Sequence, residues 1–185
     1  PTGYEEDENS EAITNILVQM LRMKQICAWD KINYAADLML ELYESNTTNW
    51  RKVLCFSQFV NEPTACVHEI AKRLMPESLF FTGNDSVDER YRIVGRFQND
   101  ASIHFLVGST KAASEGLNIT AAGAVVFNDL MWTPATHHQA EGRAYGRLSD
   151  LHTLDSYYVI CAGTIEEVIM SILDIKLGMF NEIIE

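Results

Sequence analysis

Lys52-Val-Leu-Cys-Phe-Ser57 is the stretch of sequence that decides the fold. It is a short apolar run, rich in residues that favour strands, and a polar, turn-like tract at residues 45–49 precedes it. Short continuous apolar runs of this kind are typical of strands that are buried on both faces, as in parallel sheets. The stretch therefore predicts a buried strand in an α/β domain.

The sequence after this strand alternates between helical and strand patterns. Apolar runs predict further strands at residues 78–82, 103–108, 123–128 and 155–162. Helical periodicity predicts helices at residues 62–74, 86–97, 134–146 and 164–177. Strands that alternate with helices of this length predict a parallel sheet with helices on both faces.

Short motifs mark several helix ends. Ser86 with Glu89 and Thr164 with Glu167 form two capping boxes, in which each side chain satisfies a backbone N–H of the first turn. Gly178 is expected to end the last helix. These signals place the helix starts more firmly than periodicity alone.

The chain divides into three segments by composition. Residues 1–10 are acidic and polar and are expected to form a leader or linker. Residues 11–50 carry two helical patterns, at 11–25 and 31–43, which predict an N-terminal helical hairpin packed on the following lobe. Residues 51–185 hold the α/β lobe, and 185 residues suffice for one substantial core.

Charge and composition restrict the classes of function. The net charge of −12 has the wrong sign for a broad nucleic-acid-binding surface, so any such contact is expected to be local. No segment approaches the roughly 18 apolar residues of a membrane span, and no signal peptide is visible, which predicts an intracellular protein without a membrane partner. The four cysteines form no C-x-x-C pair and are expected to be reduced, buried thiols, and no metal site is predicted.

Candidate sites lie in the loops that follow the strands, because ligands of open α/β sheets bind beyond the carboxyl ends of the strands. Three such loops stand out, at residues 57–59, 109–118 and 128–134. The chain has neither a G-x-x-x-x-G-K-[ST] loop nor a G-x-G-x-x-G fingerprint, so it carries no P-loop and no dinucleotide site of its own. This combination suggests a domain that completes an active site formed with another domain.

The predicted helix at residues 134–146 carries the most informative polar face. Gln139, Arg143 and Arg147 are spaced four apart and project from one side of a helix. Fixed guanidinium groups near a strand-end loop suit phosphoryl transfer, because negative charge develops there and arginine binds phosphate oxygens bidentately. The same pattern also fits a solvated helix edge with Glu141 as a salt-bridge partner.

Five motifs in order resemble one family of motor proteins. K-V-L-C-F-S-Q-F, F-F-T-G-N-D-S-V-D-E-R, S-T-K-A-A-S-E-G-L-N-I-T-A-A, W-T-P-A-T-H-H-Q-A-E-G-R-A-Y-G-R and G-T-I-E-E resemble motifs IV to VI of Swi/Snf-type superfamily 2 helicases. The resemblance runs from about Leu17 to Lys176. It implies the C-terminal RecA-like lobe of a two-lobe DNA translocase, in which an N-terminal lobe of the same protein supplies the P-loop and binds ATP with magnesium.

The resemblance also implies roles for individual residues. By position in motif V, Ser109, Thr110 and Lys111 are expected near the nucleic-acid backbone, and Glu115, Gly116 and Asn118 near the nucleotide. By position in motif VI, Gln139 and Arg143 are expected to face the γ-phosphate. Trp132, with Pro134, is expected in the region that contacts nucleic acid, most simply double-stranded DNA. The lobe alone is expected to be inactive, and the compartment to be the cytoplasm or nucleoid in a prokaryote or virus and the nucleus in a eukaryote.

One departure from the family pattern concerns the arginine finger. The family reads Q-A-x-x-R-x-x-R, but the third residue after Arg143 is Gly146, and Arg147 comes one position late. A shift of one residue turns a helical side chain by about 100°. Two interpretations remain open: Arg147 is the finger in a shifted register, or the chain is a degenerate, non-catalytic lobe that binds nucleic acid or protein. Polar capping by Ser109 to Lys111 and core packing by Trp132 are the simpler alternatives for those residues.

Overall fold

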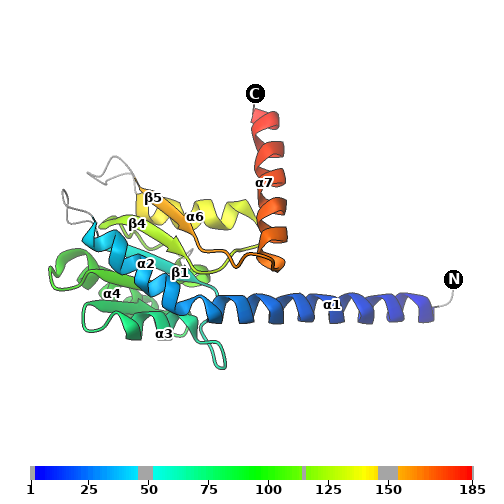
Figure 1. The fold of residues 1–185 in the computed structure, drawn as a ribbon, viewed down its shortest axis with the longest axis horizontal. Helices are drawn as coiled ribbons and strands as arrows, with labels where there is room; N and C mark the ends of the chain where they lie inside the picture. Colours follow the sequence, from blue (N-terminus) through cyan, green and yellow to red (C-terminus); the bar gives the residue numbers. More distant parts are fainter. Residues whose placement is uncertain (1–2, 46–51, 114–115, 146–153, 185) are drawn as a thin grey trace.

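A computed structural model describes residues 3–45, 52–113, 116–145 and 154–184 (Figure 1). Within these ranges the chain forms five strands and seven helices. The strands are β1 (Lys52–Ser57), β2 (Ser78–Phe81), β3 (Phe105–Ser109), β4 (Ala122–Phe127) and β5 (Asp155–Tyr158). The helices are α1 (Gly3–Asp30), α2 (Ile32–Glu44), α3 (Cys66–Arg73), α4 (Val87–Asn99), α5 (Thr110–Ala113), α6 (Pro134–Tyr145) and α7 (Ile165–Ile184).

All five strands are parallel, in the order β2-β3-β1-β4-β5. β1 is central and pairs with β3 and β4, with Phe56 beside Gly108 on one side and Phe127 on the other. Every residue of β1 after Lys52 is buried, as are all residues of β3 and β4. The prediction of a parallel sheet around Lys52–Ser57 is therefore confirmed.

Helices cover both faces of the sheet. One core cluster packs α2 and α3 against β1, β3 and β4 and includes Met39, Ile70 and Phe105. The other packs α4, α5 and α6 against the opposite face and includes Phe97 and Phe127. A smaller cluster joins α7 to the loop after β4 through Leu130, Ile169 and Leu173. Helices therefore cover both faces of the three central strands, whereas the edge strand β5 is partly exposed.

Several predicted boundaries differ from those observed. Gly178 does not end the last helix, because α7 continues to Ile184. β5 ends at Tyr158, and the chain then turns through Gly163, whose φ of +72° suits glycine. The Ser86 hydroxyl accepts the Glu89 N–H as its capping box predicts, whereas the Thr164 hydroxyl accepts the N–H of Glu166.

The two N-terminal helices form a bent pair rather than the expected hairpin. Only Lys31 separates α1 from α2, so the chain changes direction without turning back on itself (Figure 1). α2 buries Ile32, Ala35, Ala36 and Met39 against the lobe. α1 starts at Gly3, within the segment expected to be a linker, and projects beyond the lobe with Ile13, Ile16, Leu17 and Leu21 exposed. Its contact with the lobe is concentrated in its last two turns, since Lys24, Cys27 and Ala28 are buried.

A buried ion pair fastens the bend to the lobe. The Lys31 ammonium donates to both carboxylate oxygens of Glu166 at 2.7 Å and to the Val159 carbonyl at 2.6 Å. Glu166 lies in the first turn of α7 and also accepts the N–H of Cys161 at 2.9 Å. Lys31 and Glu166 are 5% and 0% exposed, so neither charge has water to replace its partner. The pair therefore connects α2, the end of β5 and α7.

Replacing Lys31 should destabilise the chain strongly. Lys31→Met leaves the Glu166 carboxylate buried without its cation, which costs about 3–5 kcal/mol of unfolding free energy. The double variant Lys31→Met/Glu166→Gln should recover much of that loss, and urea unfolding measures both. As a control, Lys72→Met removes an exposed ion pair with Glu69 and should cost less than about 1 kcal/mol. Equal costs for Lys31→Met and Lys72→Met would contradict this role of the buried pair.

Candidate functional site

The loops after β1, β3 and β4 meet at the carboxyl edge of the sheet. Ser57 at the end of β1 is paired with Ser109 at the end of β3, and Asn128 directly follows β4. The Asn128 N–H donates to the Phe56 carbonyl at 3.0 Å, which extends the pairing of β4 with β1. Because parallel strands end at the same edge, three loops that are distant in sequence come together here, as expected.

Asp129 joins two of these loops. Its carboxylate is buried, accepts the Ser57 hydroxyl at 2.5 Å and accepts the Gln58 N–H with both oxygens at 3.2 Å. Burial raises the pKa of Asp129, and the bonds from Ser57 and Gln58 oppose that rise. Asp129 thus fixes the start of the loop that leads to α6.

The rest of this loop is held by two further side chains. The Met131 N–H donates to Nε2 of His137 at 3.0 Å, and the Trp132 carbonyl accepts the Lys176 ammonium at 2.9 Å. His137 is 3% exposed, and its bond to Met131 requires an unprotonated Nε2. Its ring also packs edge-on against Phe127 and Tyr158. Pro134 is the first residue of α6, and it has no backbone N–H that would need an acceptor.

The loop after α5 is attached to α6. The Ile119 N–H donates to the Arg143 carbonyl at 2.7 Å, while Leu117 and Ile119 are buried and Asn118 between them is exposed. Gly116 has a φ of +92°, a conformation that other residues adopt only with strain. This attachment brings Asn118, predicted near the nucleotide, to the backbone of the helix that carries Gln139 and Arg143.

The remaining predicted site residues differ in exposure. Gln139 is exposed on α6, and Arg143 is partly buried. Lys111 is exposed, whereas Ser109 and Thr110 beside it are 4% and 2% exposed. Trp132 is 36% exposed, so its ring is partly open to solvent. Glu115 and Arg147 lie outside the described residues.

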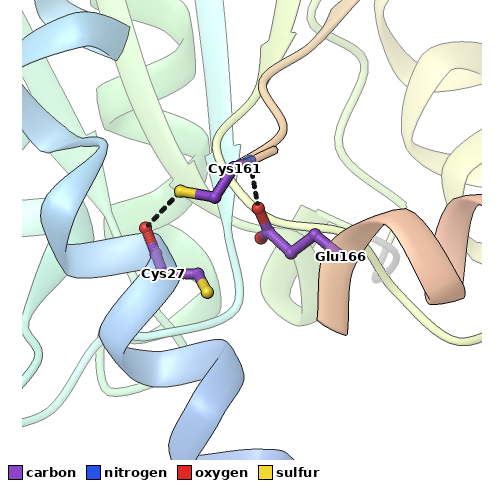
Figure 2. Close-up of side chains that lie close together, drawn as sticks. All are labelled: Cys27, Cys161 and Glu166. Carbon is purple, nitrogen blue, oxygen red and sulfur yellow. Dashed lines mark hydrogen bonds between the residues drawn. The ribbon is translucent and has the colours of Figure 1, made fainter. Parts of the chain in front are cut away.

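Sequence reasoning missed a group formed by Cys27, Cys161 and Glu166. Their potential ligand atoms lie within 4.8 Å of one another, although Cys27 and Cys161 are 134 positions apart. Figure 2 shows the Cys161 thiol directed at the Cys27 carbonyl, to which it donates at 3.8 Å, and the Glu166 carboxylate at the Cys161 N–H. Both Glu166 oxygens are already neutralised by Lys31, so we assign no metal to this group. Cys27, Cys55 and Cys66 are buried as predicted, and Cys161 is partly exposed.

Comparison with known protein families identifies the family to which this chain belongs. The model of the helicase conserved C-terminal domain matches residues 30–147. The chain belongs to the helicase C-terminal domain family. The match contains β1 to β4 and α6, and thus every loop of the candidate site.

This helicase C-terminal lobe is of the SWI2/SNF2 type. It resembles the solved SWI2/SNF2 ATPase core domain of Sulfolobus solfataricus with a TM-score of 0.69 and 29% identity, covering 92% of this chain and 36% of that one. The C-terminal domain of the Sulfolobus solfataricus ATPase matches 92% of this chain and 72% of its own, with a TM-score of 0.62 and 27% identity. The expected fold and family are therefore confirmed.

Similar curated proteins include several that are named ATP-dependent helicases. An uncharacterized ATP-dependent helicase of Mycoplasma genitalium is 31% identical over 175 residues, which cover 89% of this chain and 17% of that protein. The putative ATP-dependent helicase/translocase YwqA of Bacillus subtilis is 30% identical over 92% of this chain and 20% of its own length. The lobe thus spans about a fifth or less of these two relatives. No described helix has both the length and the apolar character that a membrane span requires.

Lowering the pH should destabilise the folded chain by protonating His137, which holds the loop before α6. Burial lowers the pKa of His137 below its ordinary 6.5, with His138 and Lys24 acting in the same direction and Glu141 against them. The unfolded chain therefore binds a proton more readily than the folded one, so unfolding free energy should fall as pH drops through 6.5. His137→Gln retains an acceptor for the Met131 N–H and should weaken this dependence in urea unfolding between about pH 7.5 and about pH 5.5. His138→Gln, on the exposed side of α6, serves as the control, and an identical pH dependence in the His137→Gln variant would refute the assignment.

Proposed function

We propose that this lobe completes an ATP site with a preceding lobe of the same polypeptide, as part of an ATP-dependent DNA translocase. The observation that carries the proposal is the position of α6, which starts beyond the carboxyl end of β4 and whose Arg143 carbonyl accepts the Ile119 N–H from the loop after α5. Gln139 and Arg143 lie on this helix, four residues apart. Similarity to proteins named ATP-dependent helicases supports a role for this lobe in ATP hydrolysis.

The chemistry of the proposed site is electrostatic. ATP with magnesium supplies the reacting phosphates when it is bound, mainly by the preceding lobe. Arg143 would bind a γ-phosphate oxygen and stabilise the negative charge that develops on it. Gln139 would face the same phosphate group from the neighbouring turn of α6. Glu115, Gly116 and Asn118 would face the nucleotide from the loop after α5. Without a P-loop, this lobe alone would not hydrolyse ATP.

Contact with nucleic acid is proposed for a small part of the surface. The net charge of −12 disfavours a broad interface. Exposed Lys111 and the partly exposed ring of Trp132 offer a phosphate contact and a flat apolar contact next to the same edge. Ser109 and Thr110, which are buried, would take part chiefly through their backbone. A relative from Homo sapiens, 28% identical over 181 residues, is named DNA annealing helicase and endonuclease ZRANB3, which supports DNA as the substrate.

A second candidate function is a non-catalytic binding module. It is favoured by Gly146, which stands where the family has its arginine finger, and by the acidic net charge. In that case the lobe would retain the fold and a partner surface without contributing to hydrolysis. The two functions differ in what happens to ATP turnover when arginines of the α6 region are removed.

Arg143→Ala in the full-length protein should lower DNA-stimulated ATP hydrolysis by about 10³-fold or more, since arginine contacts to a transferring phosphoryl group contribute this much. Steady-state hydrolysis with double-stranded DNA, single-stranded DNA and RNA measures both the loss and the preferred stimulator. Arg73→Ala is the matched control, because Arg73 lies on α3 at the opposite face of the sheet and bonds Glu69 and Asn33. Its rate should equal that of the unchanged protein.

A loss below about tenfold for Arg143→Ala would reject its role at the γ-phosphate and favour the binding module. Arg147→Ala then distinguishes the two interpretations of the finger. A loss comparable to that of Arg143→Ala supports Arg147 as a finger in a shifted register. Intact hydrolysis in Arg147→Ala, alongside an inactive Arg143→Ala, contradicts it.

A further inference from the structure

Lys24 is a buried cation that the proposed function leaves unexplained. Its side chain lies on α1 and is 0% exposed, and its ammonium has no hydrogen-bond partner among the described residues. Lysine is almost never fully buried without a partner, because moving its charge out of water is costly. A methionine would fill a similar volume without that cost, so packing alone does not account for the ammonium.

The surroundings of Lys24 consist of an aromatic ring and several charges. Its Nζ lies 4.9 Å from the centre of the Trp132 ring, within the range of a cation–π interaction. Burial lowers the pKa of Lys24 and Lys31 adds to this effect, while the carboxylates of Asp129 and Glu166 oppose it. The ammonium therefore has an electrostatic environment from three parts of the fold: Lys31 between α1 and α2, the loop after β4 and the start of α7.

Trp132 connects this environment to the candidate site. It lies two residues before Pro134, the first residue of α6. Its carbonyl is held by Lys176 of α7, and its ring lies beneath the Lys24 ammonium of α1. The neighbouring Met131 N–H is bonded to His137 of α6. A displacement of α1 near Lys24 would therefore shift the start of α6, the helix that carries Gln139 and Arg143.

We propose that Lys24 is a positioning residue, whose ammonium holds the Trp132 ring and thereby sets the start of α6 relative to α1. α1 projects far beyond the lobe (Figure 1). Through Lys24 and Trp132, the orientation of this long helix would affect the position of the α6 face that carries Gln139 and Arg143. This inference rests on the proposed function, because the consequence of correct positioning is ATP turnover. Lys24 acts through Trp132 and does not contact the nucleotide.

The test uses the full-length protein with Lys24→Met and Lys24→Arg. Lys24→Met removes the charge at similar volume and should lower kcat of DNA-stimulated ATP hydrolysis by about tenfold or more, since small misplacements of catalytic groups are costly. The KM for ATP should change less than about twofold, because most nucleotide contacts belong to the preceding lobe. Lys24→Arg retains a cation over the ring and should preserve kcat.

A second measurement examines positioning without relying on hydrolysis. Hydrogen exchange of backbone amides at residues 128–138 should be faster in Lys24→Met than in the unchanged protein, and unaltered in Lys24→Arg. Trp132→Leu should raise exchange in the same segment, and Lys24→Met should add little to it, because both changes break one contact. Full additivity of the two substitutions would overturn the route through Trp132.

The outcomes separate this inference from the proposed function. If Arg143→Ala abolishes hydrolysis but Lys24→Met changes neither kcat nor exchange, the positioning role is wrong and the proposed function stands. If Arg143→Ala leaves hydrolysis intact, the proposed function fails, and exchange at residues 128–138 alone decides whether Lys24 positions the loop. Equal losses in Lys24→Met and Lys24→Arg would show a packing requirement and also overturn the inference.

Discussion

Parallel pairing of β1 with both β3 and β4 is the constraint on which the rest of the structure depends. It requires that the three buried strands end at one edge, so that the loops after Ser57, Ser109 and Phe127 must meet. It also requires helical connections across both faces, which carry the chain from each strand to the next. The candidate site follows from this arrangement. A single strand in the opposite direction would place one of the three loops at the far edge of the sheet.

Buried charges then determine how the outer helices relate to that edge. Lys31 and Glu166 connect the α1–α2 bend to α7, and Asp129 connects the loop after β1 to the loop after β4. Lys24 lies between these two groups and faces Trp132. Apolar packing would hold the helices in place equally well, but it specifies orientation less narrowly than directed polar contacts do. These contacts join α1, α2 and α7 to the loop that leads into α6, which fits a lobe whose outer helices keep a fixed orientation relative to that loop.

The strands of the sheet were well predicted because the residue pattern that identifies each of them is local in the sequence. The apolar run Lys52–Ser57 and its successors carry their strand character within a few residues, and the Ser86 capping box acts within one turn. Predictions failed where long-range contacts decide. The spacing of Ile13, Ile16 and Leu17 resembles a buried face, yet these side chains are exposed, whereas the charged Lys24 in the same helix is fully buried. Contacts such as Lys31 with Glu166 join residues 135 positions apart, and no local pattern reveals them.

In the proposed function, α6 faces the γ-phosphate of an ATP molecule held by a preceding lobe. The most direct test is photo-crosslinking of the full-length protein with an ATP analogue that carries an aryl azide on its γ-phosphate, in the presence of double-stranded DNA. Mass spectrometry of the digested protein should find label in peptides that contain residues 134–145. Label confined to peptides outside this lobe, at saturating nucleotide and DNA, would contradict this placement of α6.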